Sequence, residues 1–339
     1  MREILIVVFS CIVQHIYAES WFQKADFGGI PRSYSICFTI GDKAYVGLGK
    51  GNIYKKDFWE YEPATNTWVQ KADFPGASRI YSVGFSVDSM GYVCTGLDSL
   101  GVALNDLWQY NPVLNTWSQK ANFAGPGLQG AVAFSIGNYG YVGTGSLTNV
   151  FYRYDPATDT WLQRASFPTS DRKFATGFTI NQKGYVVGGL YIVGLMGTAK
   201  KDLWEYDPVN DSWLQKANLP VINGRFYAAS FSIGQKGYVG TGRGPNNYHS
   251  DFYEYDPILY LWTQKLNFLG DSRCFGLGFS IGNKGYIGLG LDSLANNNDL
   301  WEYTQDTVTS VNEKNNSPIF LFAAHWGTIY LVALFLFTL

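Results

Sequence analysis

The feature that most limits the fold is a unit that recurs six times along this chain of 339 residues. Each copy begins with Trp-x-Gln-Lys/Arg, and 44 to 52 residues separate consecutive tryptophans. The six tryptophans are Trp21, Trp68, Trp117, Trp161, Trp213 and Trp262. A regular period of this length is typical of propellers and solenoids, because each unit buries its apolar face only against its neighbours.

Each unit predicts four short β-strands. The first ends in Phe-Ser/Thr-Ile/Val, and the second reads Gly-Tyr-Val/Ile with glycines close behind. The third resembles residues 202–206, and a turn such as residues 207–211 joins it to the next tryptophan strand. The 38 glycines and the 17% aromatic content agree with many strands and tight turns, so we expect an all-β fold.

The order of these motifs resembles the kelch repeat, whose signature is a glycine pair after a short strand, followed by a spaced Tyr and Trp. The resemblance covers residues 21–310. Only Gly188-Gly189 is a true pair; the other units have Gly-x-Gly or a late single glycine such as Gly96. The resemblance implies a six-bladed β-propeller of four-stranded blades, with variant packing between strands.

The phase of the repeat predicts how the ring closes. The strand at Trp21 precedes any inner strand, whereas the last unit ends at Tyr303 without a following tryptophan. We therefore expect the N-terminal strand to complete the last blade, which removes an exposed sheet edge.

The two ends of the chain differ from the repeats. Residues 1–18 have a charged start and an apolar run, which predicts a secretory signal; acylation of Cys11 in a lipoprotein is the alternative. After the propeller at 19–310 and a linker at 311–317, residues 318–339 contain no charged side chain and are long enough to cross a bilayer. These residues are expected to form a membrane anchor. The alternative is a degenerate sorting signal, because residues 310–330 resemble the opening of a type IX sorting domain without its Pro-Asn-Pro. The predicted location is secreted or cell-surface, either periplasmic or extracellular.

Arginine occupies one position, six residues before the first-strand phenylalanine, in five of the six units; the third unit has Leu128. The five arginines are Arg32, Arg79, Arg172, Arg225 and Arg273. Two residues later, the side chains are mostly aromatic. They are Tyr34, Tyr81, Phe174, Tyr227 and Phe275, with Gly130 in the third unit.

This position is expected to face the mouth of the central channel, where guanidiniums capture carboxylates or phosphates and rings stack on sugars or peptides. Resemblance to kelch domains that bind acidic peptides implies the same role for arginines at this place. The structural alternative is that each blade needs the same internal bond, for example to a carbonyl of the adjacent blade.

Repeated acidic residues are interpreted as structural. An aspartate heads the third strand in five units and is expected to bond a neighbouring backbone group; these are Asp57, Asp106, Asp202, Asp251 and Asp299. The strand glutamates recur too regularly for a single catalytic group. The cysteines left after the signal, Cys37, Cys94 and Cys274, are an odd number and are predicted to be small buried residues without a disulfide framework.

No metal or cofactor is predicted. Galactose oxidase shares the kelch propeller, but its copper site needs two His and two Tyr, and the propeller has only His249. A net charge of −2 argues against a charge-dominated nucleic-acid binder. We expect a binding module for a protein, an acidic peptide or a glycan, selecting anionic ligands. The alternatives are an enzyme of the sialic acid mutarotase type and a cell-surface scaffold.

Overall fold

The computed structural model describes residues 19–145, 148–169, 171–193, 196–305, 320–325 and 328–333. The chain forms two compact units. One is Glu19–Gln305, and the other holds Met1–Ala18 and Asp306–Leu339. The described residues are β-strands, turns and loops without a helix, which confirms the predicted all-β class.

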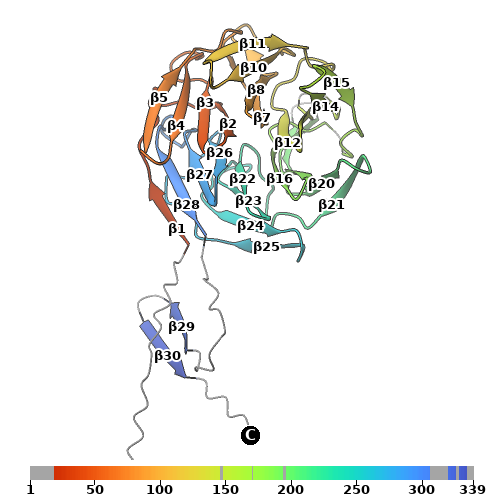
Figure 1. Ribbon diagram of the computed structural model, residues 1–339. Helices are drawn as coiled ribbons and strands as arrows, with labels where there is room; N and C mark the ends of the chain where they lie inside the picture. The colour runs from red at the N-terminus through yellow and green to blue at the C-terminus, as the bar shows by residue number, and fades with distance from the viewer. Residues whose placement is uncertain are drawn as a thin grey trace, which may run out of the picture. The chain divides into compact units, whose positions relative to one another are not determined.

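The unit Glu19–Gln305 is a propeller of six antiparallel four-stranded sheets around a centre (Figure 1). Blade 1 contains β2 (Ile36–Ile40), β3 (Lys43–Gly47), β4 (Phe58–Glu62) and β5 (Thr67–Lys71). Blade 2 contains β7 (Val83–Val87), β8 (Met90–Cys94), β10 (Leu107–Asn111) and β11 (Thr116–Lys120). Blade 3 contains β12 (Val132–Ile136), β13 (Tyr139–Gly143), β14 (Phe151–Asp155) and β15 (Thr160–Gln163). Blade 4 contains β16 (Thr176–Ile180), β17 (Lys183–Val187), β20 (Leu203–Asp207) and β21 (Ser212–Lys216). Blade 5 contains β22 (Ala229–Ile233), β23 (Lys236–Gly240), β24 (Phe252–Asp256) and β25 (Leu261–Gln264). Blade 6 contains β26 (Leu277–Ile281), β27 (Lys284–Gly288), β28 (Leu300–Thr304) and β1 (Ser20–Gln23).

The sixth blade takes its outer strand from the start of the propeller, as predicted. Strand β1 pairs antiparallel with β28, with Trp21 opposite Tyr303. The Trp21 indole donates to the Leu266 carbonyl at 3.1 Å, which also joins β1 to the fifth blade. First and last strands therefore share one sheet, and the ring closes without a free strand edge at this point.

Phenylalanines of the inner strands explain the glycine at the second position of the second strand in five of the six blades. A Cβ on Gly91 would lie 2.0 Å from the ring of Phe38, a residue of the preceding blade. The same relationship joins Gly140 to Phe85 at 2.2 Å. Glycine is therefore needed because a buried ring of the neighbouring blade fills the place of a side chain.

The late glycines of each unit link neighbouring blades through their backbone. Gly49, with φ of +83°, donates its N–H to the Arg79 carbonyl of the second blade at 3.2 Å. The equivalent bond recurs at all six boundaries, and the donors are Gly49, Gly96, Gly145, Gly189, Gly242 and Gly290. The last of these glycines is present in every unit, including those without a glycine pair. It adopts a left-handed conformation and hydrogen-bonds the next blade.

Two short ladders extend the loops of the propeller. They are β6 (Arg79–Ile80) with β9 (Leu97–Asp98), and β18 (Leu190–Val193) with β19 (Met196–Ala199). In the other unit, β29 (Phe320–His325) and β30 (Thr328–Ala333) pair antiparallel. No helix in the described part of the chain is long and apolar enough to cross a membrane. The predicted signal and the linker 311–317 lie outside the described residues.

Candidate functional site

The five repeated arginines are buried inside their own blades. Each guanidinium meets the aspartate that heads the third strand of the same unit at two points, and the Nη2–Oδ2 distances are 2.7–2.8 Å. The arginine residues are only 0–2% exposed. Four of them also donate to a carbonyl of the same blade, as Arg79 does to Thr95 at 3.0 Å.

The predicted convergence of guanidiniums on the channel mouth is therefore wrong for Arg32, Arg79, Arg172, Arg225 and Arg273. The structural alternative is correct, although the carbonyl acceptor lies in the same blade. The interpretation of the repeated aspartates as backbone partners is also wrong. Their carboxylates accept from arginine and, in four blades, from a tryptophan indole two residues later, as Asp106 does from Trp108 at 2.7 Å.

The third blade shows what replaces this pair. Leu128 is fully buried, and Val150 stands where the other blades have aspartate; both belong to one apolar cluster. The arginine and the aspartate are thus present together in five units and absent together from the third. This joint absence is visible in the sequence and indicates that the two positions depend on each other.

The ion pairs keep their carboxylates charged. Burial by itself raises the pKa of Asp106, but the hydrogen bonds and charge of Arg79 and the bond from Trp108 bring the pKa below its ordinary value. The pKa values of Asp57, Asp202 and Asp251 are lowered by the same balance. These four carboxylates are therefore charged at neutral pH, although among the described residues the Nε atoms of Arg172 and Arg225 have no hydrogen-bond partner.

The aromatic residues near the arginines do converge. We call Tyr34, Tyr81, Phe174, Tyr227 and Phe275 the aromatic floor. Ring centroids of Tyr227 and Phe275 are 3.6 Å apart, and Tyr81 of the second blade reaches Tyr227 of the fifth at 6.2 Å. Rings from five blades thus meet at the axis, on the face where the inner strands begin, which we call the loop face. Of the predicted site residues, the structure brings together Tyr34, Tyr81, Phe174 and Tyr227, with Phe275 added.

The backbone holds the floor in place. All five aromatic residues have φ between 56° and 63°, a left-handed conformation that is uncommon for bulky side chains. Their amides form a chain of bonds between blades, as Phe174 accepts from Tyr227 at 3.0 Å and donates to Gly130 at 2.8 Å. Gly130 supplies the same backbone turn without a ring, and the floor therefore has its gap at the third blade.

Three cations stand beside the floor. The Lys173 ammonium lies 5.0 Å from the Phe174 ring centroid. Lys50 and Arg243 are exposed and belong to the short bridges that pair with residues 33 and 226, one position before the floor residues. None of the three has a carboxylate within 4.0 Å among the described residues. Sequence reasoning missed them because they do not recur from unit to unit.

Beneath the floor, the inner strands line an open cavity of ≈ 200 Å³. Small residues and hydroxyls line it, among them Gly84, Ser86, Ser135 and Ser280. Its lining contains no charged side chain. This cavity therefore offers hydroxyls and backbone groups, but no charged side chain, to a ligand.

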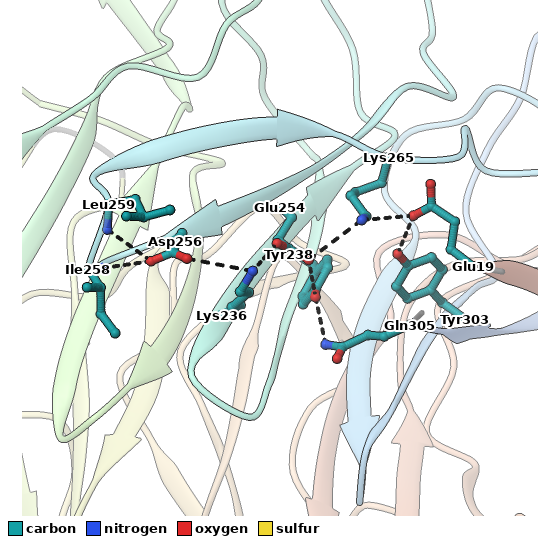
Figure 2. A network of polar contacts seen from close by, with 10 residues as sticks. All are labelled: Glu19, Lys236, Tyr238, Glu254, Asp256, Ile258, Leu259, Lys265, Tyr303 and Gln305. Atoms are coloured by element: carbon teal, nitrogen blue, oxygen red, sulfur yellow. Dashed lines mark hydrogen bonds and ion pairs between the residues drawn. The ribbon is translucent and has the colours of Figure 1, made fainter. Parts of the chain in front are cut away.

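The strand glutamates form internal networks, in agreement with their interpretation as structural residues. In the fifth blade, Glu254 accepts from Lys236 and from Tyr238, both at 2.6 Å (Figure 2). Across the boundary, Lys265 and Tyr303 both meet the Glu19 carboxylate, at 3.2 and 2.8 Å (Figure 2). The first, fourth and sixth blades repeat the Lys–Glu–Tyr arrangement at Glu60, Glu205 and Glu302.

The three cysteines in the described region are free thiols. Cys94 and Cys274 are buried, whereas Cys37 is half-buried and donates to the Gly278 carbonyl at 3.3 Å. Burial raises the pKa of Cys274 to about 12. These thiols are therefore poor nucleophiles and pack as small residues.

Comparison with solved structures supports the fold. The protein described as "Structure of YjhT" aligns with a TM-score of 0.73 and 18% identity, over 85% of this chain and 99% of that one. No protein-family model matches this sequence. No curated protein matches it either.

Proposed function

We propose that this chain is an exported, kelch-type binding module whose ligand surface is the aromatic floor and its neighbouring cations. The observation that carries the proposal is the meeting of five rings from five blades at one end of the axis. A closely packed aromatic surface offers stacking area to a sugar or to apolar parts of a peptide.

The cations make anionic ligands the preferred class. Lys50, Lys173 and Arg243 have no carboxylate partner within the described structure, so a ligand carboxylate adds a favourable charge interaction without displacing an internal one. Burial lowers the pKa of Lys173, and an incoming anion would favour its charged form. The partner is therefore a protein, an acidic peptide or an acidic glycan.

The buried arginines support this surface from behind. Arg172 and Arg225 precede Phe174 and Tyr227 by two residues, and their ion pairs hold the loops from which the rings project. Direct contact of these guanidiniums with a ligand stays an untested prediction. Attachment to a membrane through residues 318–339 is likewise part of the proposal.

The test is a thermal-shift titration of the full chain with sialic acid, uronic acids and acidic peptides. A ligand at 100 times its dissociation constant is expected to stabilise the fold by ~2.7 kcal/mol. Lys173→Gln and Arg243→Gln should each weaken the response, whereas Lys120→Gln on outer strand β11 should leave it unchanged. An equal response in all three variants would refute the proposed surface.

Two other outcomes decide between the alternatives. A response to sialic acid alone, together with faster exchange of its anomers by NMR, would favour an enzyme of the sialic acid mutarotase type. A flat response over the whole panel would favour the scaffold.

A further inference from the structure

Five of the six boundaries between blades share one hydrogen-bonded arrangement. It is centred on the residue directly before the outermost strand of the blade. At the boundary of blades 5 and 6 this residue is Glu19, whose carboxylate accepts from the Tyr303 hydroxyl at 2.8 Å and the Leu266 amide at 3.1 Å. Lys265 adds its ammonium at 3.2 Å. Three donors from two blades thus converge on one carboxylate, and Figure 2 shows two of them, the Lys265 ammonium and the Tyr303 hydroxyl.

Four other boundaries have an equivalent acceptor. One side-chain oxygen accepts from a tyrosine hydroxyl of its own blade and from a backbone amide of the preceding blade, at distances of 2.6–2.9 Å. The acceptors are Asn66, Asn115, Asp159 and Asp211. Where the acceptor is Asp211, Arg164 supplies the cation at 3.3 Å.

The boundary of blades 4 and 5 lacks the acceptor. Tyr260 occupies the turn position, with φ of 55°, and its side chain has no carboxylate or amide oxygen. The hydroxyl of Tyr255, the counterpart of Tyr303, is fully buried and has no hydrogen-bond partner among the described residues. The Ala217 carbonyl still accepts from the Trp262 indole at 2.8 Å, so the backbone keeps the position that it has at the other boundaries.

A cation and a cavity accompany the unpaired hydroxyl. Lys216, the counterpart of Lys265, is only 9% exposed, and its ammonium lies 3.4 Å from the Glu205 carboxylate and 4.8 Å from the Tyr260 ring centroid. Lys265 has the equivalent carboxylate, Glu254, at 4.0 Å and meets Glu19 as a second one. A cavity of ≈ 190 Å³ opens beside Lys216 and Tyr260, and the Glu205 carboxylate also lines it, whereas Tyr255 and Ala217 lie outside its lining. Its volume is below the usual range for drug-sized ligands, so it admits only small molecules.

We propose that the boundary of blades 4 and 5 binds a small carboxylate, whose oxygens take the place that the Glu19 carboxylate takes at the next boundary. The ammonium of Lys216, the hydroxyl of Tyr255 and the amide of Ala217 are its donors. The Tyr260 ring, 58% exposed at the tip of the turn, moves off Lys216 to admit it. A buried donor without a partner is costly, and a bound carboxylate removes that cost. This site is separate from the aromatic floor and does not depend on the proposed function.

The test is titration of the full chain with acetate at constant ionic strength, with acetamide as the uncharged counterpart. Acetate is expected to raise the melting temperature and to give a saturable calorimetric signal, and acetamide is not. Tyr255→Phe is expected to weaken acetate binding about tenfold without loss of stability, since it removes an unsatisfied hydroxyl.

Tyr260→Asp supplies the missing acceptor within the chain. This variant should melt at a higher temperature than the parent protein and should no longer respond to acetate. Tyr303→Phe, at a boundary with its own carboxylate, should lower stability and leave acetate binding unchanged. Lys120→Gln, at a boundary where Asp159 is the acceptor, should also leave it unchanged. Absence of any difference between acetate and acetamide, or an undiminished acetate response in Tyr260→Asp, would overturn the proposal.

Discussion

Arg79 and Asp106 form a two-point ion pair inside the second blade, with Nη2 and Oδ2 2.7 Å apart and the arginine residue fully buried. The same pair recurs in four other blades, while the third blade uses Leu128 and Val150. The same propeller thus fills these two positions with an ion pair in five blades and with apolar side chains in one. Because the backbone is shared, the two can be exchanged experimentally.

The first prediction concerns this exchange. Arg79→Leu alone should destabilise the propeller by ~3–5 kcal/mol, because it leaves the Asp106 carboxylate partly buried without its cation. The double variant Arg79→Leu/Asp106→Val copies the third blade and should recover most of the loss. Urea unfolding of the two variants measures both values. A double variant as unstable as the single one would show that the apolar pair works only in its own blade.

The second prediction concerns acid. The pKa of Asp106 lies below its ordinary value of 3.8 in the folded protein, so folding disfavours protonation. The contribution of the pair is therefore complete above pH ~4, the ordinary range of aspartate, and is lost as the pH falls through the lower folded-state pKa. Urea unfolding between pH 2 and 7 should show the stability gap between the parent protein and Asp106→Asn shrinking only at the acid end. A gap independent of pH would contradict it.

The third prediction concerns contact between blades. Gly91→Ala should destabilise the fold by ~1–3 kcal/mol, because the new Cβ would lie 2.0 Å from the Phe38 ring. Phe38→Leu in the same chain should restore part of the loss by vacating that space. The first blade provides the reference, since it has Ala44 at the position of Gly91. Thermal unfolding of the single and double variants checks the coupling.

The fourth prediction concerns ring closure. Trp21 is 5% exposed and packs edge-on against Phe252 and Phe268 of the fifth blade, at 5.1 and 5.2 Å. Trp21→Ala should cost ~3–5 kcal/mol and free the N-terminal strand for proteolysis. Limited proteolysis with N-terminal sequencing measures this release. Phe22→Ala, at an exposed position of the same strand, is the control and should have little effect.

The sequence by itself determined the six-fold repeat, the four strands of each unit and the closure by residues 20–23. These properties are periodic along one dimension, and a repeat that cannot bury its apolar face alone must stack in order. It also determined which aromatic residues form the floor, since Tyr34, Tyr81, Phe174 and Tyr227 stand at one repeat position.

Only the tertiary structure decided what the arginines do. A long side chain at the start of a strand can turn outward or inward, and the choice depends on an aspartate 25–30 residues away that completes the pair. The unpaired Tyr255 hydroxyl could not be predicted from the sequence either. Its missing partner would come from the turn that ends at Tyr260, and the other donors come from the neighbouring blade. The contacts around the Tyr255 hydroxyl would cross the boundary between two blades, so the pattern within one unit cannot specify them.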